Sequence, residues 1–306
     1  MTVLRALIGL ALGFGIAFGT YYGLTIALSS ATSVAIGSQS AGDHKAPPKH
    51  GTQPGRDNHK PASQGNSKGP ALIVGLICGA LGGLYGLVAF GKGIYGFGPL
   101  SILGFILDVS WSLLNAVASL VWVLVCTITG SGFVDPTPDS KRSGTFVYKT
   151  NPRGGGYDAT TIGTAIAGGW CSHEETHVWQ ARIFGPLYMP VYVTSLALNL
   201  VFRLITGKTK DVSQEAYYRI CFEDWAYAAG AVSGDEETKR HINWGLWFLW
   251  FFLSTLYVSF PVAMVAGFAT KMYVVGIVAT GGLVVYSLIR ALLARWNHSD
   301  SGASSS

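Results

Sequence analysis

The chain has 306 residues, of which 49% are hydrophobic and only 12% are charged. Soluble domains carry about 25% charged residues, so this chain lacks the side chains from which a wholly water-facing surface is made. The formal net charge of +5 does not indicate a nucleic-acid partner, because the Lys and Arg residues flank apolar runs and do not form one patch interleaved with aromatic residues.

The first apolar run has the length of a membrane-spanning helix. Residues 3–28 are almost entirely apolar, and about 20 residues are enough to cross the hydrocarbon. We therefore expect residues 1–30 to form a transmembrane anchor; the alternative is a cleaved signal peptide, whose apolar core is usually about 7 to 15 residues long. Residues 31–70 are rich in Ser, Gly, Pro, Lys and His and predict a disordered polar loop.

Later apolar segments predict a mainly α-helical, polytopic membrane protein with about five spans. Two runs within residues 71–129 predict a transmembrane hairpin, and its glycines provide small faces on which membrane helices pack closely. Two more runs within residues 244–295 predict a second hairpin, followed by a polar tail over residues 296–306.

Residues 130–243, between the hairpins, predict a domain outside the membrane. The segments GTFVYKT and YDATTIGTAIAGG flank a turn at NPRGGG, which predicts a small β-hairpin of two short strands. Ser172 and Glu175 have the spacing of a capping box, and they predict a helix with the sequence SHEETHVWQARIF that ends near Gly185.

Residues 187–206 are apolar but carry Ser195, Asn199 and Arg203 at intervals of four residues. On a helix this spacing produces one polar stripe, which a span surrounded by lipid would not favour. We therefore expect an interfacial or re-entrant helix here. If the segment crosses the membrane instead, residues 207–243 lie on the opposite side from the preceding helix.

The basic residues predict the orientation of this integral, multi-pass membrane protein. Residues 31–70, residues 130–243 and the C-terminus are placed in the cytoplasm, because this choice puts nearly all Lys and Arg inside. The basic residues left outside are Arg5, Lys92 and Lys271.

Residues 173–177 read His-Glu-Glu-Thr-His, which is an HExxH motif. Two His residues four positions apart project from one helical face and can hold one Zn²⁺, while the Glu after the first His sits beside the metal-bound water as a general base. Zinc lowers the pKa of that water to roughly 7. Chance produces this pattern in about 3 of 1,000 chains of this composition, so the motif predicts His173 and His177 as ligands and Glu174 as the base.

A zinc site of this kind needs a third protein ligand. Glu223 is the preferred candidate, because Ala226 three residues later is small and lets this helix pack closely on the HExxH helix. Glu215 has Arg219 four residues later and is explained more simply as half of an ion pair. The remaining glutamates outside the motif, in a charged turn, are Glu236 and Glu237.

The motif pair resembles a known class of peptidases. HEETH followed by Glu223-x-x-Ala226 is similar to the gluzincin pattern of HExxH plus a downstream ExxA(D), and the several spans resemble the membrane-embedded CAAX-type and heat-shock-type zinc peptidases. The string HEETHVWQARIFGPLY also resembles unassigned membrane proteins with HExxHxxQ and FGPLY. The resemblance covers about residues 160–230 and implies a zincin-like domain with zinc ligands His173, His177 and Glu223.

The chain departs from this pattern at one position. Tyr227 stands where an Asp often follows ExxA in those peptidases. That Asp usually orients a ligand histidine, so Asp224 or another group has to take its place if the site is active. The strand-like ATTIGTAIAGG fits the same resemblance, since an edge strand before the metal helix pairs with an extended peptide; a plain hairpin is an equal alternative.

Four further side chains are candidates to support the site. Gln180 lies on the same helical face as the two histidines, with an ordinary surface position as the alternative. Tyr218 and His241 could stabilise an oxyanion, or could serve in packing and interfacial anchoring. Asp108 lies in an apolar span, where ionisable groups are functional candidates, although a hydrogen bond between helices explains it equally well.

These features predict an integral-membrane, zinc-dependent metallopeptidase that cleaves a peptide or membrane protein at the surface of the lipid bilayer. One alternative is an inactive zinc-binding scaffold or sensor, which the loss of the Asp after ExxA favours. Another is a non-enzymatic membrane protein in which HEETH is an ordinary helix end. The sequence leaves the substrate and the oligomeric state open.

Overall fold

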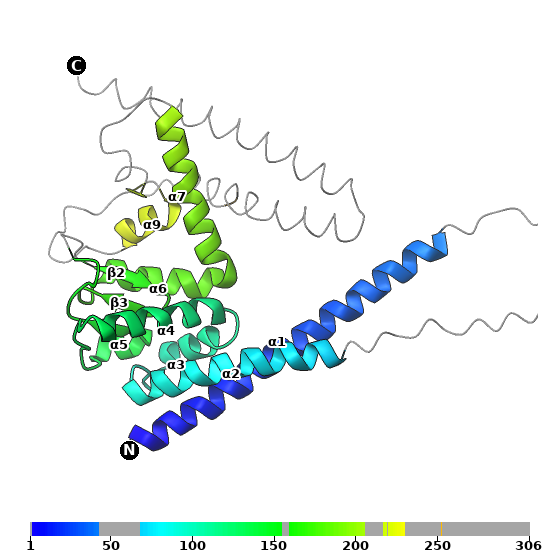
Figure 1. Ribbon diagram of the computed structural model, residues 1–306, viewed down its shortest axis with the longest axis horizontal. Coiled ribbons are helices and arrows are strands. Elements are labelled where there is room, and N and C mark those ends of the chain that lie inside the picture. The colour runs from blue at the N-terminus through cyan, green and yellow to red at the C-terminus, as the bar shows by residue number, and fades with distance from the viewer. Residues whose placement is uncertain are drawn as a thin grey trace, which may run out of the picture. The chain divides into compact units, whose positions relative to one another are not determined.

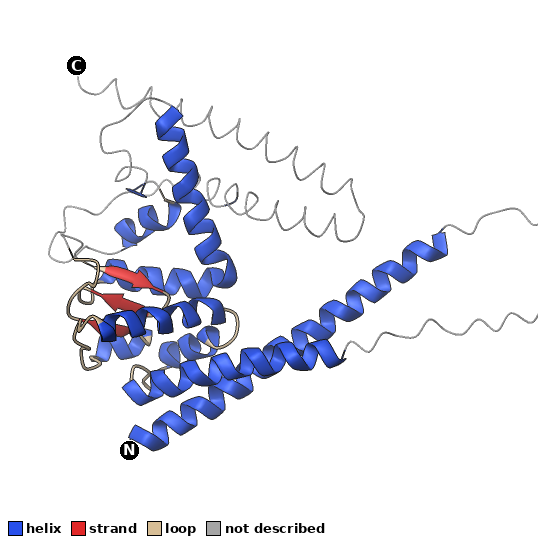
Figure 2. Cartoon of the chain, viewed as in Figure 1, coloured by secondary structure: helices blue, strands red, loops and turns tan. Residues whose placement is uncertain are grey.

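The computed structural model describes a mainly helical chain with one small sheet (Figures 1 and 2). Three described helical segments are long and apolar enough to cross a membrane. The chain divides into two compact units, one built from residues 1–120 and 136–144 and the other from residues 121–135 and 145–306. The residues described are 2–42, 68–154, 159–205, 217–218, 220–229 and 252.

The first unit is built on an antiparallel helix pair, α1 (Thr2–Gly42) and α2 (Lys68–Lys92). The sequence predicts an anchor that ends at residue 30, but α1 continues to Gly42, so residues 31–42 are helical and do not belong to a loop. The reason is visible in the sequence: no proline and no charged side chain interrupts the helix between residue 31 and Asp43.

Glycines bring α1 and α2 into backbone contact. A Cβ added at Gly86 would overlap the carbonyl of Gly9, and one added at Gly13 would overlap the carbonyl of Gly82. Membrane helices gain van der Waals contact where small residues let their backbones approach in this way. The contacts also fix the direction of the pair, because they place the N-terminal part of α1 beside the C-terminal part of α2.

The expected span over residues 98–129 is broken into α3 (Pro99–Asp108) and α4 (Leu113–Ile128), which meet at an angle of 93°. The helix over this segment is therefore not continuous, and the pair is either a broken span or a re-entrant loop. Polar groups are satisfied at the break: the Asp108 carboxylate accepts hydrogen bonds from Tyr85 and Tyr95, and Tyr21 donates to the carbonyl of Ser110. Irregular backbone within an apolar segment requires such partners.

The chain returns after α4 to the end of α2. The short helix α5 (Pro138–Ser143) packs against α3, and a Cβ at Gly96 would lie 3.8 Å from the Cβ of Lys141. Gly96 precedes α3 and Lys141 lies on α5, so the chain on either side of the broken segment comes back together at this contact.

The described part of the second unit has three strands, whereas the sequence predicts a hairpin of two. The strands are β1 (Phe146–Tyr148), β2 (Thr160–Ile162) and β3 (Ala165–Ala167), in the order β1-β3-β2. β2 and β3 form an antiparallel hairpin, and β1 pairs parallel with β3. Gly163, with φ of 59°, turns the chain and divides the predicted second strand in two. The strand directly before the HExxH helix, β3, is therefore central, and β2 is at the edge.

Three helices follow the sheet and build the site. They are α6 (Ser172–Phe184), α7 (Tyr188–Ile205), joined to α6 by the 3₁₀ turn η1 (Gly185–Leu187), and α9 (Cys221–Ala229). The predicted end of α6 at Gly185 is confirmed, but the capping box is wrong: Cys171 is the N-cap residue, without a side-chain cap bond, and its carbonyl accepts from the amide of Glu175.

The polar stripe on α7 faces the protein. Ser195 and Arg203 are buried, whereas Val193 and Val201 on other faces of the helix are exposed. The stripe is therefore turned into the protein, and the segment Ser172–Val201 that carries part of it is long and apolar enough to cross a membrane. The predictions for residues 43–67, for His241, for the hairpin over 244–295 apart from Phe252, and for the tail over 296–306 concern positions outside the described residues.

We expect Gly86→Ala to destabilise the protein, because its methyl group would force α1 and α2 apart. Gly19→Ala is a matched control, since no atom lies within 4 Å of its Cβ position. Thermal unfolding in detergent should show a loss on the order of 1 to 3 kcal/mol for Gly86→Ala and none for Gly19→Ala, where Ala is the better helix former. Equal losses in both variants would contradict the glycine contact.

A disulfide tests the return of the chain to the end of α2. Gly96→Cys combined with Lys141→Cys should crosslink on mild oxidation, because the Cβ separation of 3.8 Å equals the mean of about 3.8 Å in disulfides. Gly98→Cys with Lys141→Cys should not crosslink, since nothing lies within 4 Å of the Gly98 Cβ position. A single crossing over residues 98–129 would separate these ends by about 30 Å and abolish the crosslink.

Candidate metal centre

His173 and His177 lie one turn apart on α6 and present their Nε2 atoms to the same point. The two Nε2 atoms are 3.2 Å apart and the rings meet edge to face. Both side chains are buried. This is the arrangement predicted from the HExxH spacing.

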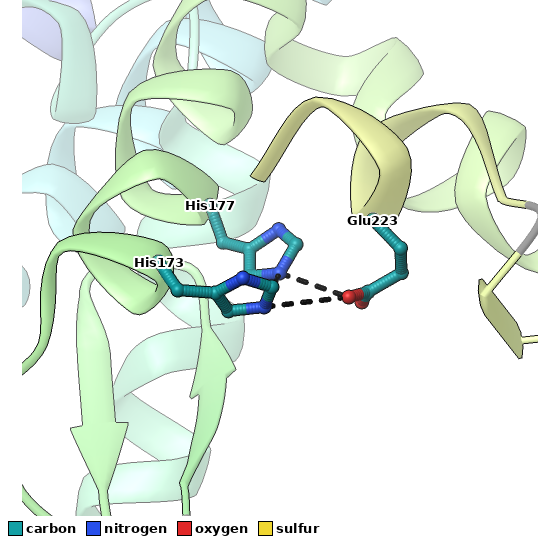
Figure 3. Close-up of side chains that lie close together, drawn as sticks. All are labelled: His173, His177 and Glu223. Atoms are coloured by element: carbon teal, nitrogen blue, oxygen red, sulfur yellow. Dashed lines mark hydrogen bonds and ion pairs between the residues drawn. The ribbon is translucent and has the colours of Figure 1, made fainter. Parts of the chain in front are cut away.

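Glu223 completes the group from a different helix. Its carboxylate, carried by α9, faces both rings (Figure 3), with Oε2 at 3.4 Å from Nε2 of His173 and Oε1 at 3.4 Å from Nε2 of His177. The structure thus brings together the three predicted ligands, although Glu223 is 46 residues from His177 in the sequence. These three residues could hold a metal ion.

The spacing of these atoms suits a small metal ion. A tetrahedral ion with bonds of about 2.0–2.1 Å to nitrogen and oxygen keeps its ligand atoms about 3.3–3.4 Å apart. The observed separations are 3.2 Å between the two nitrogens and 3.4 Å from each nitrogen to the nearer carboxylate oxygen. In addition, Glu223 Oε2 is buried and has no hydrogen-bond partner among the described residues. Such an atom is costly to bury unless a cation or donor satisfies it.

The carboxylate of Glu223 is held in its ionised form. Burial raises its pKa, but the adjacent rings of His177 and His173 and the hydrogen bond from Tyr192 lower it more, so the pKa falls well below the ordinary value of 4.5. Tyr192 on α7 donates to Oε1 at 2.6 Å. This bond fixes the carboxylate and leaves Oε2 directed at His173.

Gln180 joins the two helices that carry the ligands. It is completely buried, its Oε1 lies 2.9 Å from Nδ1 of His177, and its Nε2 donates to the carbonyl of Phe222 at 2.9 Å. The first contact orients the His177 ring, and the second fixes α9 next to Glu223. The surface position considered for Gln180 is therefore wrong, because the side chain is buried against His177.

Glu174 also lies at this group. It is 8% exposed, and Oγ1 of Thr161 on the edge strand β2 donates to its Oε2 at 2.5 Å. A carboxylate that follows the first histidine of the motif stands where a base for a water on the ion is needed. The hydrogen bond from Thr161 limits the rotamers of this carboxylate.

His173 is supported differently from His177. Its Nδ1 is buried and lacks a hydrogen-bond partner among the described residues, so Asp224 does not take the orienting role considered for it. Instead the ring of Tyr227 lies 4.4 Å from the His173 ring, centroid to centroid. Tyr227 thus packs against the ligand that an Asp at this position was expected to orient.

The other predicted support residues are accounted for in different ways. Tyr218 packs its ring against those of Tyr217 and Tyr227, which agrees with the packing alternative. Asp108 belongs to the first unit, where it accepts hydrogen bonds from Tyr85 and Tyr95. This agrees with the alternative of a hydrogen bond between helices. His241 lies outside the described residues.

Sequence reasoning missed Thr161, Tyr188 and Tyr192. The hydroxyl of Tyr188 lies 3.4 Å from Nδ1 of His177. A signal for both tyrosines was present, because Tyr188 and Tyr192 continue the stripe of Ser195, Asn199 and Arg203 at helical spacing. Nothing in the sequence marks Thr161, which reaches the site through the pairing of the strands.

Comparison with known protein families, with curated proteins and with solved structures finds no match to this chain.

We expect Gln180→Met to weaken metal binding about 10-fold to 100-fold, because loss of a residue that orients a ligand has effects of this size. Gln180→Glu, which keeps an acceptor for Nδ1 but loses the donor to Phe222, should be intermediate. Competition with a chromogenic chelator measures both affinities. Wild-type affinity in Gln180→Met would contradict the orienting role.

Proposed function

We propose that the protein is an integral-membrane, zinc-dependent metallopeptidase that cleaves peptide bonds at the membrane surface. The observation that carries the proposal is the convergence of two imidazole nitrogens and one buried carboxylate at ligand spacing, with Glu174 directly beside them. Helices of membrane-spanning length in the same chain support a location in a bilayer.

The donor set favours zinc. Two imidazoles and one carboxylate are the ligands of a well-known class of catalytic zinc sites, which keep a further position for water or substrate. Calcium and magnesium prefer oxygen ligands in larger number. Thiolates such as Cys171 and Cys221 are not needed to complete the set.

Zinc bound by His173, His177 and Glu223 would polarise a substrate carbonyl and lower the pKa of a water molecule to about 7. Glu174 would take the proton from that water and pass it to the leaving nitrogen. Its hydrogen bond from Thr161 would hold the carboxylate in place for both transfers. Burial of the ligands would strengthen the electrostatic interactions in the site, because little water is present there to screen the charges.

The edge strand β2 suggests how a peptide would be held. β3 is paired on both sides, so β1 and β2 are the edge strands of the described sheet, and Thr161 on β2 contacts the proposed base. An extended peptide pairing with β2 would have its backbone fixed by main-chain hydrogen bonds, with little demand on its side chains. The proposed substrate is accordingly an unfolded or extended segment of a peptide or membrane protein.

A second function is favoured by one observation. Nδ1 of His173 is buried without a hydrogen-bond partner among the described residues, and Tyr227 packs on the ring. Loss of the outer-shell partner of a ligand histidine lowers metal affinity or activity by about 10-fold to 100-fold, so a site without this partner can hold a metal and still be a poor catalyst. This arrangement would suit an inactive zinc-binding scaffold or sensor in the membrane.

Glu174→Gln distinguishes the two functions. We expect this variant to keep the metal, since it changes no ligand, and to lose cleavage of a peptide library in detergent micelles by about 10²-fold or more. Glu175→Gln is the matched control, because it makes the same change one residue later. Mass spectrometry of new peptide ends measures cleavage, and elemental analysis measures the metal.

Two outcomes would contradict the proposed peptidase function. Glu174→Gln that cleaves as fast as wild type would refute its role as the base. Metal-loaded wild type that cleaves no peptide in the library would favour the scaffold or sensor.

A further inference from the structure

A cavity of about 320 Å³ lies in the first unit, between the loop after α2, the start of α3 and the helix α5. Most of its wall is apolar, and two basic side chains from α5 stand at it. The residues that define this cavity include Gly96, Pro99, Leu100, Lys141 and Arg142.

The cavity lies close to the end of a helix of membrane-spanning length. α2 is long and apolar enough to span a membrane, and its last residue is Lys92. Gly96 follows only four residues later and lies against Lys141, with 3.8 Å between the Cβ positions. α5 is therefore held close to the C-terminal end of α2.

The residues beside the cavity are suited to acyl chains. Phe97, in the loop after α2, is 93% exposed. Leu100 and Leu103 on α3 are also exposed to about half of their surface. Exposed large apolar side chains at the end of a span contact lipid and not water, because a protein in water rarely exposes so many together.

The charge at the cavity has one sign. Lys141 and Arg142 are exposed, and none of the described residues that line the cavity is acidic. Asp139 lies on the same helix but not in the lining. Basic side chains near the end of a membrane-spanning helix attract anionic lipid headgroups.

We propose that this cavity binds an anionic phospholipid, with its phosphate held by Lys141 and Arg142 and its glycerol and upper acyl region against Leu100 and Pro99. A free anion would satisfy the cations but not the apolar wall. A zwitterionic lipid would fill the apolar wall but would gain less from the cations, because its own ammonium group opposes them. The site is separate from the metal centre and does not depend on its function.

Native mass spectrometry of the detergent-purified full chain tests the proposal. We expect wild type to retain phosphatidylglycerol at least about tenfold more tightly than phosphatidylcholine. Lys141→Gln with Arg142→Gln should lose this preference, whereas Lys141→Arg with Arg142→Lys should keep it. Lys149→Gln with Arg153→Gln, which removes two other exposed cations, is the matched control and should bind as wild type.

Three results would overturn the proposal. The first is equal retention of the two lipids by wild type, a result that does not depend on whether any variant folds. The second is displacement of phosphatidylglycerol by millimolar inorganic phosphate, which would show a simple anion site. The third is an unchanged preference in a folded Lys141→Gln, Arg142→Gln protein.

Discussion

The structure of the second unit depends on one costly interaction, the burial of the Glu223 carboxylate against His173 and His177. Glu223 is only 1% exposed. A buried charge destabilises a fold by several kcal/mol unless it is paired and hydrogen-bonded. The neighbouring side chains supply these partners. The same contacts therefore determine both the packing of α6, α7 and α9 and the geometry of the candidate metal centre.

Apolar packing fixes the helices on which this interaction depends. Ala181 on α6, Val191 on α7 and Phe222 on α9 belong to one buried cluster. Gln180 and Tyr192 add polar links from α6 and α7 to the segment around Glu223. Because each of the three helices contributes to both the apolar and the polar contacts, a shift of any one of them would move a ligand or its partner.

The sequence predicts the parts of the site that follow from local spacing. The i and i+4 positions of His173 and His177 require only a helix, and Glu223 is recognisable because few glutamates are present and a small residue follows it. The burial of Gln180 and the contact of Thr161 with Glu174 depend on how helices and strands pack, which periodicity does not encode. These two features are visible only in the structure.

Two errors in the predicted fold have the same origin. Hydropathy over residues 98–129 is continuous, and the break after Asp108 is stabilised by Tyr85 and Tyr95, which come from other segments. Likewise, Gly163 within an apparently continuous β-prone run creates the β2 and β3 hairpin and moves β3 to the centre of the sheet. In both places a long-range partner or a single turn residue overrides the local pattern.

X-ray absorption spectroscopy of the protein purified with its metal tests the central claim most directly. We predict a zinc edge, nitrogen and oxygen ligands at about 2.0–2.1 Å, and the outer-shell scattering of two imidazole rings. Sulfur at about 2.3 Å, which would have to come from a cysteine such as Cys171 or Cys221, would contradict the claim. So would a protein that binds no metal while α6 and α9 remain folded.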